Sequence, residues 1–281
     1  MHFPAVESAL FAVADTSQDV LPPHRRVLGV RVDATNYLDA TARILKWAEE
    51  RRGRYVCFAN VHMTMECHDS PALQQAVNEA DLVTPDGMPL VWALTRMGVA
   101  NQTRVYGPTL TLNVCEAAAR EGVPVGFYGA SEQVLQDLVS NLTKRFPGLD
   151  VAYAHSPPFR ELTGAEADAI CGRISESGAR ILFVGLGCPR QELWMASHRY
   201  RMSVVMLGVG AAFDFHAASV KQAPAWLQAR GLEWLFRLTM EPRRLWRRYL
   251  VHNPRFVALM LLQLLGLRRF EHDVRRRKGA S

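Results

Sequence analysis

The chain has 281 residues, of which 49% are hydrophobic and 21% charged, a composition that excludes disordered, collagen-like and low-complexity proteins. Its formal net charge of +6 is unevenly distributed. Residues 225–281 carry 13 basic and 4 acidic side chains, whereas residues 1–224 carry 20 basic and 23 acidic ones. A basic tail on a slightly acidic body predicts an anionic partner, which could be nucleic acid, a membrane face or a phosphorylated ligand.

The predicted elements alternate between strands and helices along most of the chain. Residues 1–24 are expected to form a flexible lead-in. The predicted strands are 27–32, 55–59, 81–84, 123–128, 151–154, 180–184 and 203–207, and the predicted helices are 37–51, 63–80 with an interruption near Ser70-Pro71, 88–97, 110–120, 132–145, 165–177 and 191–200. This alternation predicts an α/β protein with an open, mostly parallel sheet and helices on both faces.

The pattern changes near Pro224, where we expect a boundary. Residues 25–223 would form the sheet domain, and residues 224–281 a helical appendage broken by Pro224, Pro242 and Pro254. The longest apolar stretch, residues 256–267, has twelve residues, whereas a membrane-spanning helix needs about 20. We therefore expect no spanning helix.

The N-terminus and the cysteines indicate a cytoplasmic protein. Glu7, Asp15 and Asp19 interrupt the region where a signal peptide would need an apolar run. The five cysteines are odd in number and show no C-x-x-C spacing. We therefore expect a reducing compartment, with neither a disulfide framework nor a zinc site.

Two predicted strands end in residues that could take part in chemistry, because ligands bind at the carboxyl ends of the strands in an open parallel sheet. Asn60 follows the strand at 55–59 and could point its amide into the crevice, or could simply be a helix N-cap. Asp86, in the sequence Thr84-Pro85-Asp86-Gly87, could act there as a general base, or could belong to an ordinary turn.

Further loops at this edge carry glycines that allow a ligand to approach the backbone. The turn at 128–131 resembles a phosphate-binding turn but lacks G-x-G-x-x-G, which favours a single nucleotide over a dinucleotide. The loops at 185–192 and 208–215 could bind a ligand or could be purely structural. In the structural case, Glu192 would stabilise a helix dipole and Asp214 would hold its loop. The candidate substrate contacts in these loops are Gly129, Gly185, Gly187, Gln191, Glu192 and Asp214.

Several common active-site motifs are absent from the sequence. There is no Walker loop, no G-x-S-x-G elbow and no H-E-x-x-H, which argues against a P-loop NTPase, an α/β-hydrolase and a zincin. The Asp-x-Asp pair that holds the metal in many nucleotide-sugar glycosyltransferases is also missing. We therefore expect neither a metal nor another cofactor.

The basic tail combines arginines with apolar residues. Arg244, Arg247 and Arg248 share one face of a predicted helix and could clamp a phosphate. The apolar stretch 256–267 has basic flanks, which is typical of a helix that lies on an anionic membrane. The basic run 275–278 would add to that attraction. Plain packing on the sheet domain and nucleic-acid binding are the alternatives, but a nucleic-acid arm does not need the apolar stretch.

Four motifs, in order, resemble the WecG/TagA/CpsF glycosyltransferases. They are ADLVTPDG at 80–87, FVGLGCPRQE at 183–192, GVGAAFDF at 208–215 and GLEWLFRL at 231–238. The resemblance, which spans about 27–249, implies a Rossmann-like core and a C-terminal appendage that docks on the membrane and completes the active site. It implies inverting, metal-independent transfer from a UDP-sugar to a polyprenyl-diphosphate-linked sugar at the cytoplasmic membrane face, in surface or exopolysaccharide synthesis.

The resemblance also implies roles for single residues. Asp86 would deprotonate the acceptor hydroxyl, with Asn60 beside it and Arg104 stabilising charge in the pocket. Gln191 would contact a substrate, and the residues that would hold the diphosphate are Arg237, Arg244 and Arg247. N-acetylmannosamine, its uronic acid and glucose all fit the family as the transferred sugar. A non-catalytic protein that binds a UDP-sugar or a lipid diphosphate is the alternative, and apolar surface near the tail could pair subunits.

Overall fold

The computed structural model describes residues 22–270. Most of the predicted N-terminal lead-in and the basic run 275–278 lie outside the described residues. Within them, the predicted alternation of strands and helices is confirmed, and most element boundaries lie within a few residues of the predicted ones.

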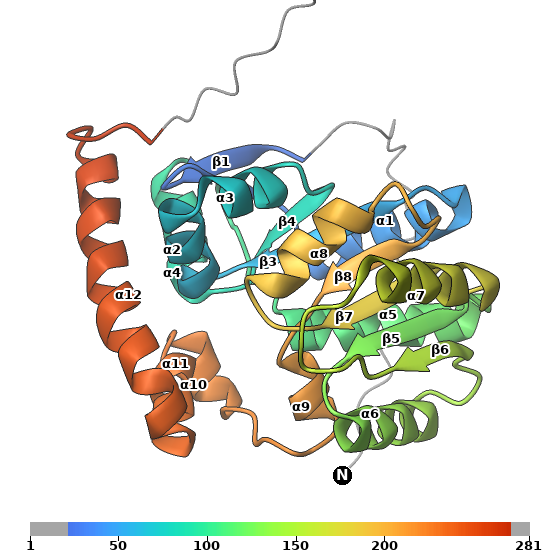
Figure 1. Cartoon of the computed structure of the whole chain (residues 1–281). Coiled ribbons are helices and arrows are strands. Elements are labelled where there is room, and N and C mark those ends of the chain that lie inside the picture. Colours follow the sequence, from blue (N-terminus) through green and yellow to red (C-terminus); the bar gives the residue numbers. More distant parts are fainter. Residues whose placement is uncertain (1–21, 271–281) are drawn as a thin grey trace, which may run out of the picture.

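The core of the molecule is a parallel sheet of six strands in the order β4-β3-β8-β7-β5-β6 (Figure 1). Each neighbouring pair runs parallel. The strands are β3 (Arg54–Ala59), β4 (Leu82–Pro85), β5 (Val125–Gly129), β6 (Val151–His155), β7 (Ile181–Gly185) and β8 (Val205–Gly208). Successive residues of β3 are buried in opposite core clusters, Tyr55 and Cys57 on one side and Val56 and Phe58 on the other. Burial on both sides explains why these strands are apolar throughout.

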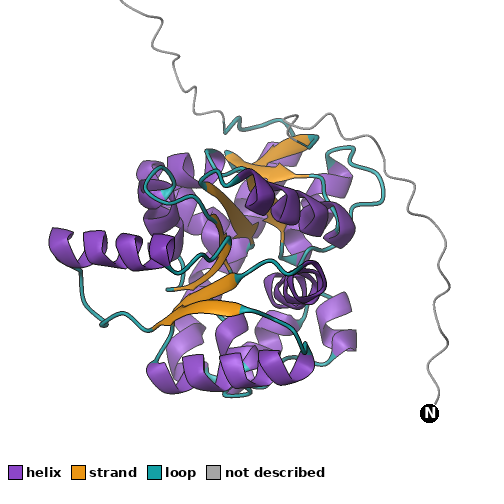
Figure 2. Cartoon of the chain, turned by 90° about the vertical axis from the view of Figure 1, so that its right-hand side faces the viewer, coloured by secondary structure: helices purple, strands orange, loops and turns teal. Residues whose placement is uncertain are grey.

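Helices cover both faces of this sheet, as Figure 2 shows from the side. One face carries α2 (Val61–Asp69), α3 (Pro71–Asn78), α4 (Met88–Arg96), α7 (Gly164–Glu176) and α8 (Arg190–His198). The other carries α1 (Tyr37–Glu50), α5 (Gly107–Glu121), α6 (Glu132–Arg145) and α9 (Ala212–His216). The predicted Rossmann-like α/β architecture is therefore confirmed.

The predicted strand at 27–32 is wrong, because this segment turns back on itself. Two short strands, β1 (His24–Val27) and β2 (Val30–Asp33), form an antiparallel hairpin that is separate from the main sheet. Leu28 and Gly29 make the turn with φ of 51° and 89°. Positive φ at both central residues is the type I′ geometry that suits a two-residue hairpin. Leu-Gly is a weak sequence signal for this turn compared with Asn-Gly.

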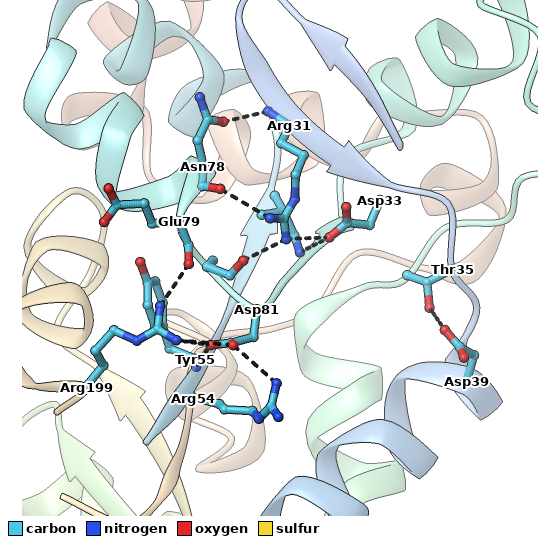
Figure 3. Close-up of polar contacts among 12 residues, drawn as sticks. Arg31, Asp33, Thr35, Asp39, Arg54, Tyr55, Asn78, Glu79, Asp81 and Arg199 are labelled. Atoms are coloured by element: carbon cyan, nitrogen blue, oxygen red, sulfur yellow. Dashed lines mark hydrogen bonds and ion pairs between the residues drawn. The ribbon is translucent and has the colours of Figure 1, made fainter. Parts of the chain in front are cut away.

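The hairpin is fixed to the sheet by a polar network at the amino ends of the strands (Figure 3). The buried carboxylate of Asp33 accepts a hydrogen bond from the backbone N–H of Val83 in the edge strand β4 at 2.7 Å and one from Arg31 at 2.9 Å. Nearby, Arg199 and Arg54 both pair with Asp81. These contacts lie at the amino ends of the strands, whereas the predicted site residues follow the carboxyl ends.

The C-terminal region is helical, as predicted. It comprises α10 (Ala225–Ala229), α11 (Glu233–Met240) and α12 (Pro242–Leu264), and Figure 1 shows α12 beside α2 at one end of the sheet. The break predicted at Pro254 is wrong, because this proline lies inside α12. Proline removes one backbone hydrogen bond from a helix, but burial of Phe256 and Met260 in the sheet's core cluster holds the segment that follows. Among residues 22–270, no helix combines the length and the apolar character needed to span a bilayer.

Candidate active site

A large cleft lies between the body and the C-terminal helices. Its volume is about 680 Å³, and its walls come from the ends of β3 and β4, from α4, and from α10 to α12. Five of the residues predicted from the sequence line it: Asn60, Asp86, Arg104, Arg237 and Arg248. The cleft therefore brings together residues from the first motif and from the basic tail.

Asn60 and Asp86 lie side by side at the carboxyl ends of β3 and β4. Asn60 is a helix N-cap and also contacts Asp86, because its two amide atoms have different partners, and its role in chemistry stays a prediction. Its Oδ1 accepts a hydrogen bond from the N–H of Met63 at 3.1 Å and caps α2, while its Nδ2 donates to Oδ2 of Asp86 at 3.3 Å. Gly87 permits this approach, since a Cβ there would lie 3.2 Å from the Asn60 backbone.

The carboxylate of Asp86 is held in place and electrostatically tuned. Its Oδ1 accepts a hydrogen bond from the backbone N–H of Gly107 at the start of α5, at 2.9 Å. Burial raises the pKa of Asp86, and the positive charge of Arg104 is the largest influence in the opposite direction. A carboxyl group with a raised pKa is a stronger base once it is ionised, which is what proton abstraction from a sugar hydroxyl needs.

Arg104 joins the body to the appendage. Its Nε donates to the backbone carbonyl of Asp86, and its Nη2 donates to Oε2 of Glu233 at 2.7 Å. The other carboxylate oxygen of Glu233 accepts a hydrogen bond from the hydroxyl of Tyr106 at 2.8 Å, and the Arg104 guanidinium lies 3.9 Å from the centre of that ring. Glu233 is the first residue of α11. Sequence reasoning gave it no role, although it belongs to the GLEWLFRL motif.

The arginines of the appendage do not all face the cleft. Arg237 and Arg248 line it, whereas Arg244 and Arg247 are exposed and lie outside its lining. Arg244 pairs with Glu241 at 2.9 Å. Burial lowers the pKa of Arg248, so its charge is held in a partly desolvated place where it would interact strongly with an anion. Arg248 shares the predicted basic face, but the motif resemblance did not select it.

The glycine loops lie outside the lining of this cleft. Gln191 is buried and ties them together: its Nε2 donates to the carbonyl of Gly208 at 2.6 Å, and its Oε1 accepts from the N–H of Gly187 at 3.1 Å. Glu192 beside it is also buried, and burial raises its pKa to about 7. These contacts explain the residues structurally, and their roles in substrate binding stay predictions.

Gly129, Gly185 and Asp214 also have local surroundings that explain them. A Cβ on Gly129 would lie 2.5 Å from the backbone of Gly185, and one on Gly185 would lie 2.6 Å from the ring of Phe213. Burial raises the pKa of Asp214, and the positive charges of Arg244 and Arg237 act in the opposite direction. Contact of these residues with a substrate stays a prediction.

The far part of the cleft is apolar. Trp92 of α4 and Val257, Leu261 and Leu264 of α12 belong to its lining. Each of these four side chains is at least 41% exposed, so the cleft continues into an open hydrophobic surface. No sequence motif marked Trp92, because a tryptophan on an amphipathic helix is usually part of a core.

A buried carboxyl group at the ends of parallel strands, in a cleft lined by arginines and extended by apolar side chains, is typical of a ligand site in an α/β enzyme. The chain belongs to the WecG/TagA/CpsF family of glycosyl transferases, whose sequence profile matches residues 25–270. The predicted family membership is confirmed, and the protein is a glycosyltransferase by family. The chain is similar to the N-acetylglucosaminyldiphosphoundecaprenol N-acetyl-beta-D-mannosaminyltransferase of Bacillus spizizenii, with 29% identity over 216 residues, which cover 76% of this chain and 81% of that protein.

Proposed function

We propose that this chain is an inverting, metal-independent glycosyltransferase that moves a sugar from a UDP-sugar to a polyprenyl-diphosphate-linked sugar. It would act in cell-surface or exopolysaccharide synthesis, at the cytoplasmic face of the membrane. The observation that carries the proposal is the shared cleft, which is lined by Asp86 of the body and by Arg237 and Arg248 of the appendage. The family match and the relative's lipid-linked acceptor support it.

Asp86 is the base in this reaction. Its carboxylate takes the proton of the acceptor hydroxyl, the hydroxyl oxygen forms a bond to the anomeric carbon, and the bond from that carbon to UDP breaks on the opposite face. Asn60 and the N–H of Gly107 hold the two carboxylate oxygens, so that the base is oriented before substrate arrives.

The arginines take the place that a metal has in other nucleotide-sugar enzymes. A guanidinium group matches phosphate oxygens with paired N–H donors and keeps its charge at any physiological pH. Arg237 and Arg248 in the cleft are placed to hold a diphosphate, and Arg104 lies next to the base. Arg244 and Arg247 are exposed beside them and would reach phosphate at the membrane surface.

The acceptor's lipid and the membrane account for the exposed apolar surface. Thirteen of the eighteen large hydrophobic side chains that are exposed in residues 22–270 lie between positions 226 and 267. Such a concentration is unusual on a monomeric soluble protein and marks a membrane or protein interface. The exposed arginines around it favour an anionic membrane. Without a membrane, the same surface would pair two copies of the chain.

A substrate screen tests the reaction. The full chain is mixed with individual UDP-sugars and a polyprenyl-diphosphate-linked N-acetylglucosamine, and the product mass is measured. One donor should give a product heavier by one sugar residue, with free UDP released. No transfer with any donor, while UDP and the lipid diphosphate both bind, would instead favour a binding protein on this fold.

A flotation assay tests the membrane surface. Trp246→Ser combined with Leu250→Ser removes two exposed apolar side chains of α12 that lie outside the cleft lining. The protein should then lose co-flotation with anionic liposomes, whereas Leu38→Ser, which changes an exposed leucine of the body, should float as the parent does. A gel shift with DNA or RNA that survives the double substitution would point to nucleic acid instead.

A further inference from the structure

Two histidines and a glutamate meet where α12 packs against α2. His62 and Glu66 are one turn apart on α2, and His252 of α12 lies against them. Nδ1 of His62 and Nε2 of His252 each lie 3.7 Å from Oε1 of Glu66. The two rings are nearly perpendicular, at 87°, with their centres 5.4 Å apart. One ligand atom from each residue fits within a span of 4.8 Å.

These separations are too long for hydrogen bonds and close to those around a metal ion. Ligands about 2.0–2.2 Å from a tetrahedral centre lie about 3.4 Å from one another. The two separations of 3.7 Å to Glu66 therefore need a closure of only a few tenths of an ångström, and the two histidine nitrogens, which lie within 4.8 Å of each other, would have to move closer together as well. A hydrogen bond would require a nitrogen–oxygen distance of about 3 Å. The three groups therefore converge without satisfying one another.

The His62 nitrogen that lies nearest Glu66 has no hydrogen-bond partner. This atom, Nδ1, is buried, although it is 3.7 Å from Oε1 of Glu66. A buried polar atom without a partner is uncommon and costs free energy. A cation bound to His62 through Nδ1 would remove that cost.

The surrounding charges select the kind of cation. Arg248 and Arg237 place positive charge near His62, which disfavours an ion held by electrostatics alone. Mg²⁺ and Ca²⁺ prefer oxygen ligands, and the site offers a single carboxylate. Zn²⁺, Co²⁺ and Ni²⁺ form strong bonds to imidazole nitrogen, and two histidines with one glutamate is a known zinc ligand set.

We propose that His62, Glu66 and His252 bind one divalent transition-metal ion of the zinc class, which joins α12 of the appendage to α2 of the body. The sugar transfer proposed above does not involve this ion, whose role is to hold the two walls of the cleft together. The neighbouring contacts between the two helices are the Arg255–Asp69 ion pair and the burial of Phe256 and Met260. The sequence-based expectation of no zinc site considered the spacing of the cysteines. It could not detect this cluster, because nothing in the sequence shows that α2 and α12 lie side by side.

Cobalt binding tests the site on the full chain. The protein is stripped with a chelator, returned to buffer and titrated with Co²⁺, whose visible absorption reports tetrahedral nitrogen and oxygen ligands. We expect one Co²⁺ per chain, displaced by Zn²⁺ and not by excess Mg²⁺. His252→Gln and Glu66→Gln should each weaken binding by at least about 100-fold, because even residues that only orient a ligand contribute 10–100-fold. His24→Ala, which removes an exposed histidine of β1, should leave binding unchanged.

A second measurement tests the joining of the helices and does not depend on activity. Zn²⁺ should raise the unfolding temperature of the stripped protein and slow hydrogen exchange in 242–264, and both effects should vanish in His252→Gln. The proposal is wrong if the stripped protein gives no tetrahedral cobalt spectrum. It is equally wrong if His252→Gln and Glu66→Gln, shown to be folded by circular dichroism, bind Co²⁺ as the parent does.

Discussion

The sheet body and the C-terminal helices contribute different things to one cleft. In the body, strands buried on both sides hold Asn60 and Asp86 at their carboxyl ends, where backbone and side-chain hydrogen bonds fix both groups. In α10 to α12, the buried residues are Leu245, Tyr249, Phe256 and Met260, and most large hydrophobic side chains face outward. The proposed base thus comes from a rigid scaffold, and the proposed phosphate-binding arginines come from a layer whose outer surface is largely apolar. The cleft is lined by residues of both regions and forms only when the two are docked.

The largest effect should come from the body's side of the cleft. Asp86→Asn removes the proposed base while keeping a side chain of the same shape, so kcat should fall by roughly 10²–10⁴, with UDP binding and folding retained. Steady-state transfer rates and calorimetric UDP titration measure the two. Asp150→Asn, on an exposed loop residue, is the matched control. Full activity in Asp86→Asn would remove this residue as the base.

If Asp86 is the base, the rate of transfer should depend on pH. Because the pKa of Asp86 is raised above its usual value by burial, and only the ionised form accepts a proton, the rate should increase as pH rises through that pKa. A profile with no rise above the usual range for an aspartate would contradict the assignment.

The next largest effect should come from the appendage's side. Arg248→Ala removes one guanidinium from the cleft wall. A hydrogen bond to a charged group contributes about 1.5–3 kcal/mol, so kcat/KM for the lipid-diphosphate acceptor should fall about 10–100-fold. Arg243→Ala, on an exposed residue of the same helix that does not line the cleft, should change it little. Equal losses in both variants would show a general charge effect in place of a phosphate site.

The buried carboxyl group of Glu192 in the body should make the free energy of unfolding depend on pH. The pKa of Glu192 is about 7 in the folded protein and 4.5 in the unfolded reference. Between these values the folded state holds a proton that the unfolded state has lost, so stability falls as pH rises through this window. Glu192→Gln should therefore be more stable than the parent by about 3 kcal/mol at about pH 8, with no advantage below about pH 4.5. Denaturant unfolding at both ends of the window measures this difference.

The smallest effect should come from the contact between the two regions. Glu233→Gln keeps the side chain's shape but removes the charge that pairs with Arg104. This pair is largely shielded from solvent, with side-chain exposures of 16% and 14%. We therefore expect the substitution to weaken the stabilisation of the transition state by about 1 kcal/mol, so that kcat/KM falls by roughly 10-fold at most. Glu166→Gln, in a solvent-exposed ion pair of the body, should have no measurable effect. If the two variants behave alike, the Arg104–Glu233 contact does not align the site.

Much of the fold could be predicted, because its signals are local. The strand–helix alternation, the apolar strands and the four motifs required no knowledge of distant contacts. The mistakes fell where local signals were weak. Leu28-Gly29 is an uncommon type I′ pair, so the hairpin was predicted as one strand. Pro254 normally ends a helix, but tertiary packing of Phe256 and Met260 keeps α12 continuous.

For the site, the sequence by itself placed Asn60 and Asp86 at the carboxyl ends of strands, where ligands bind in an open parallel sheet, and the family resemblance implied that the two lie side by side. Only the tertiary structure decided which arginine faces the cleft. Adjacent residues on a helix point about 100° apart, so the choice between Arg247 and Arg248 depends on how α12 is rotated by its buried residues. The pairing of Glu233 with Arg104 and the meeting of His252 with His62 were decided in the same way, since both join segments whose proximity arises only when the appendage packs on the body.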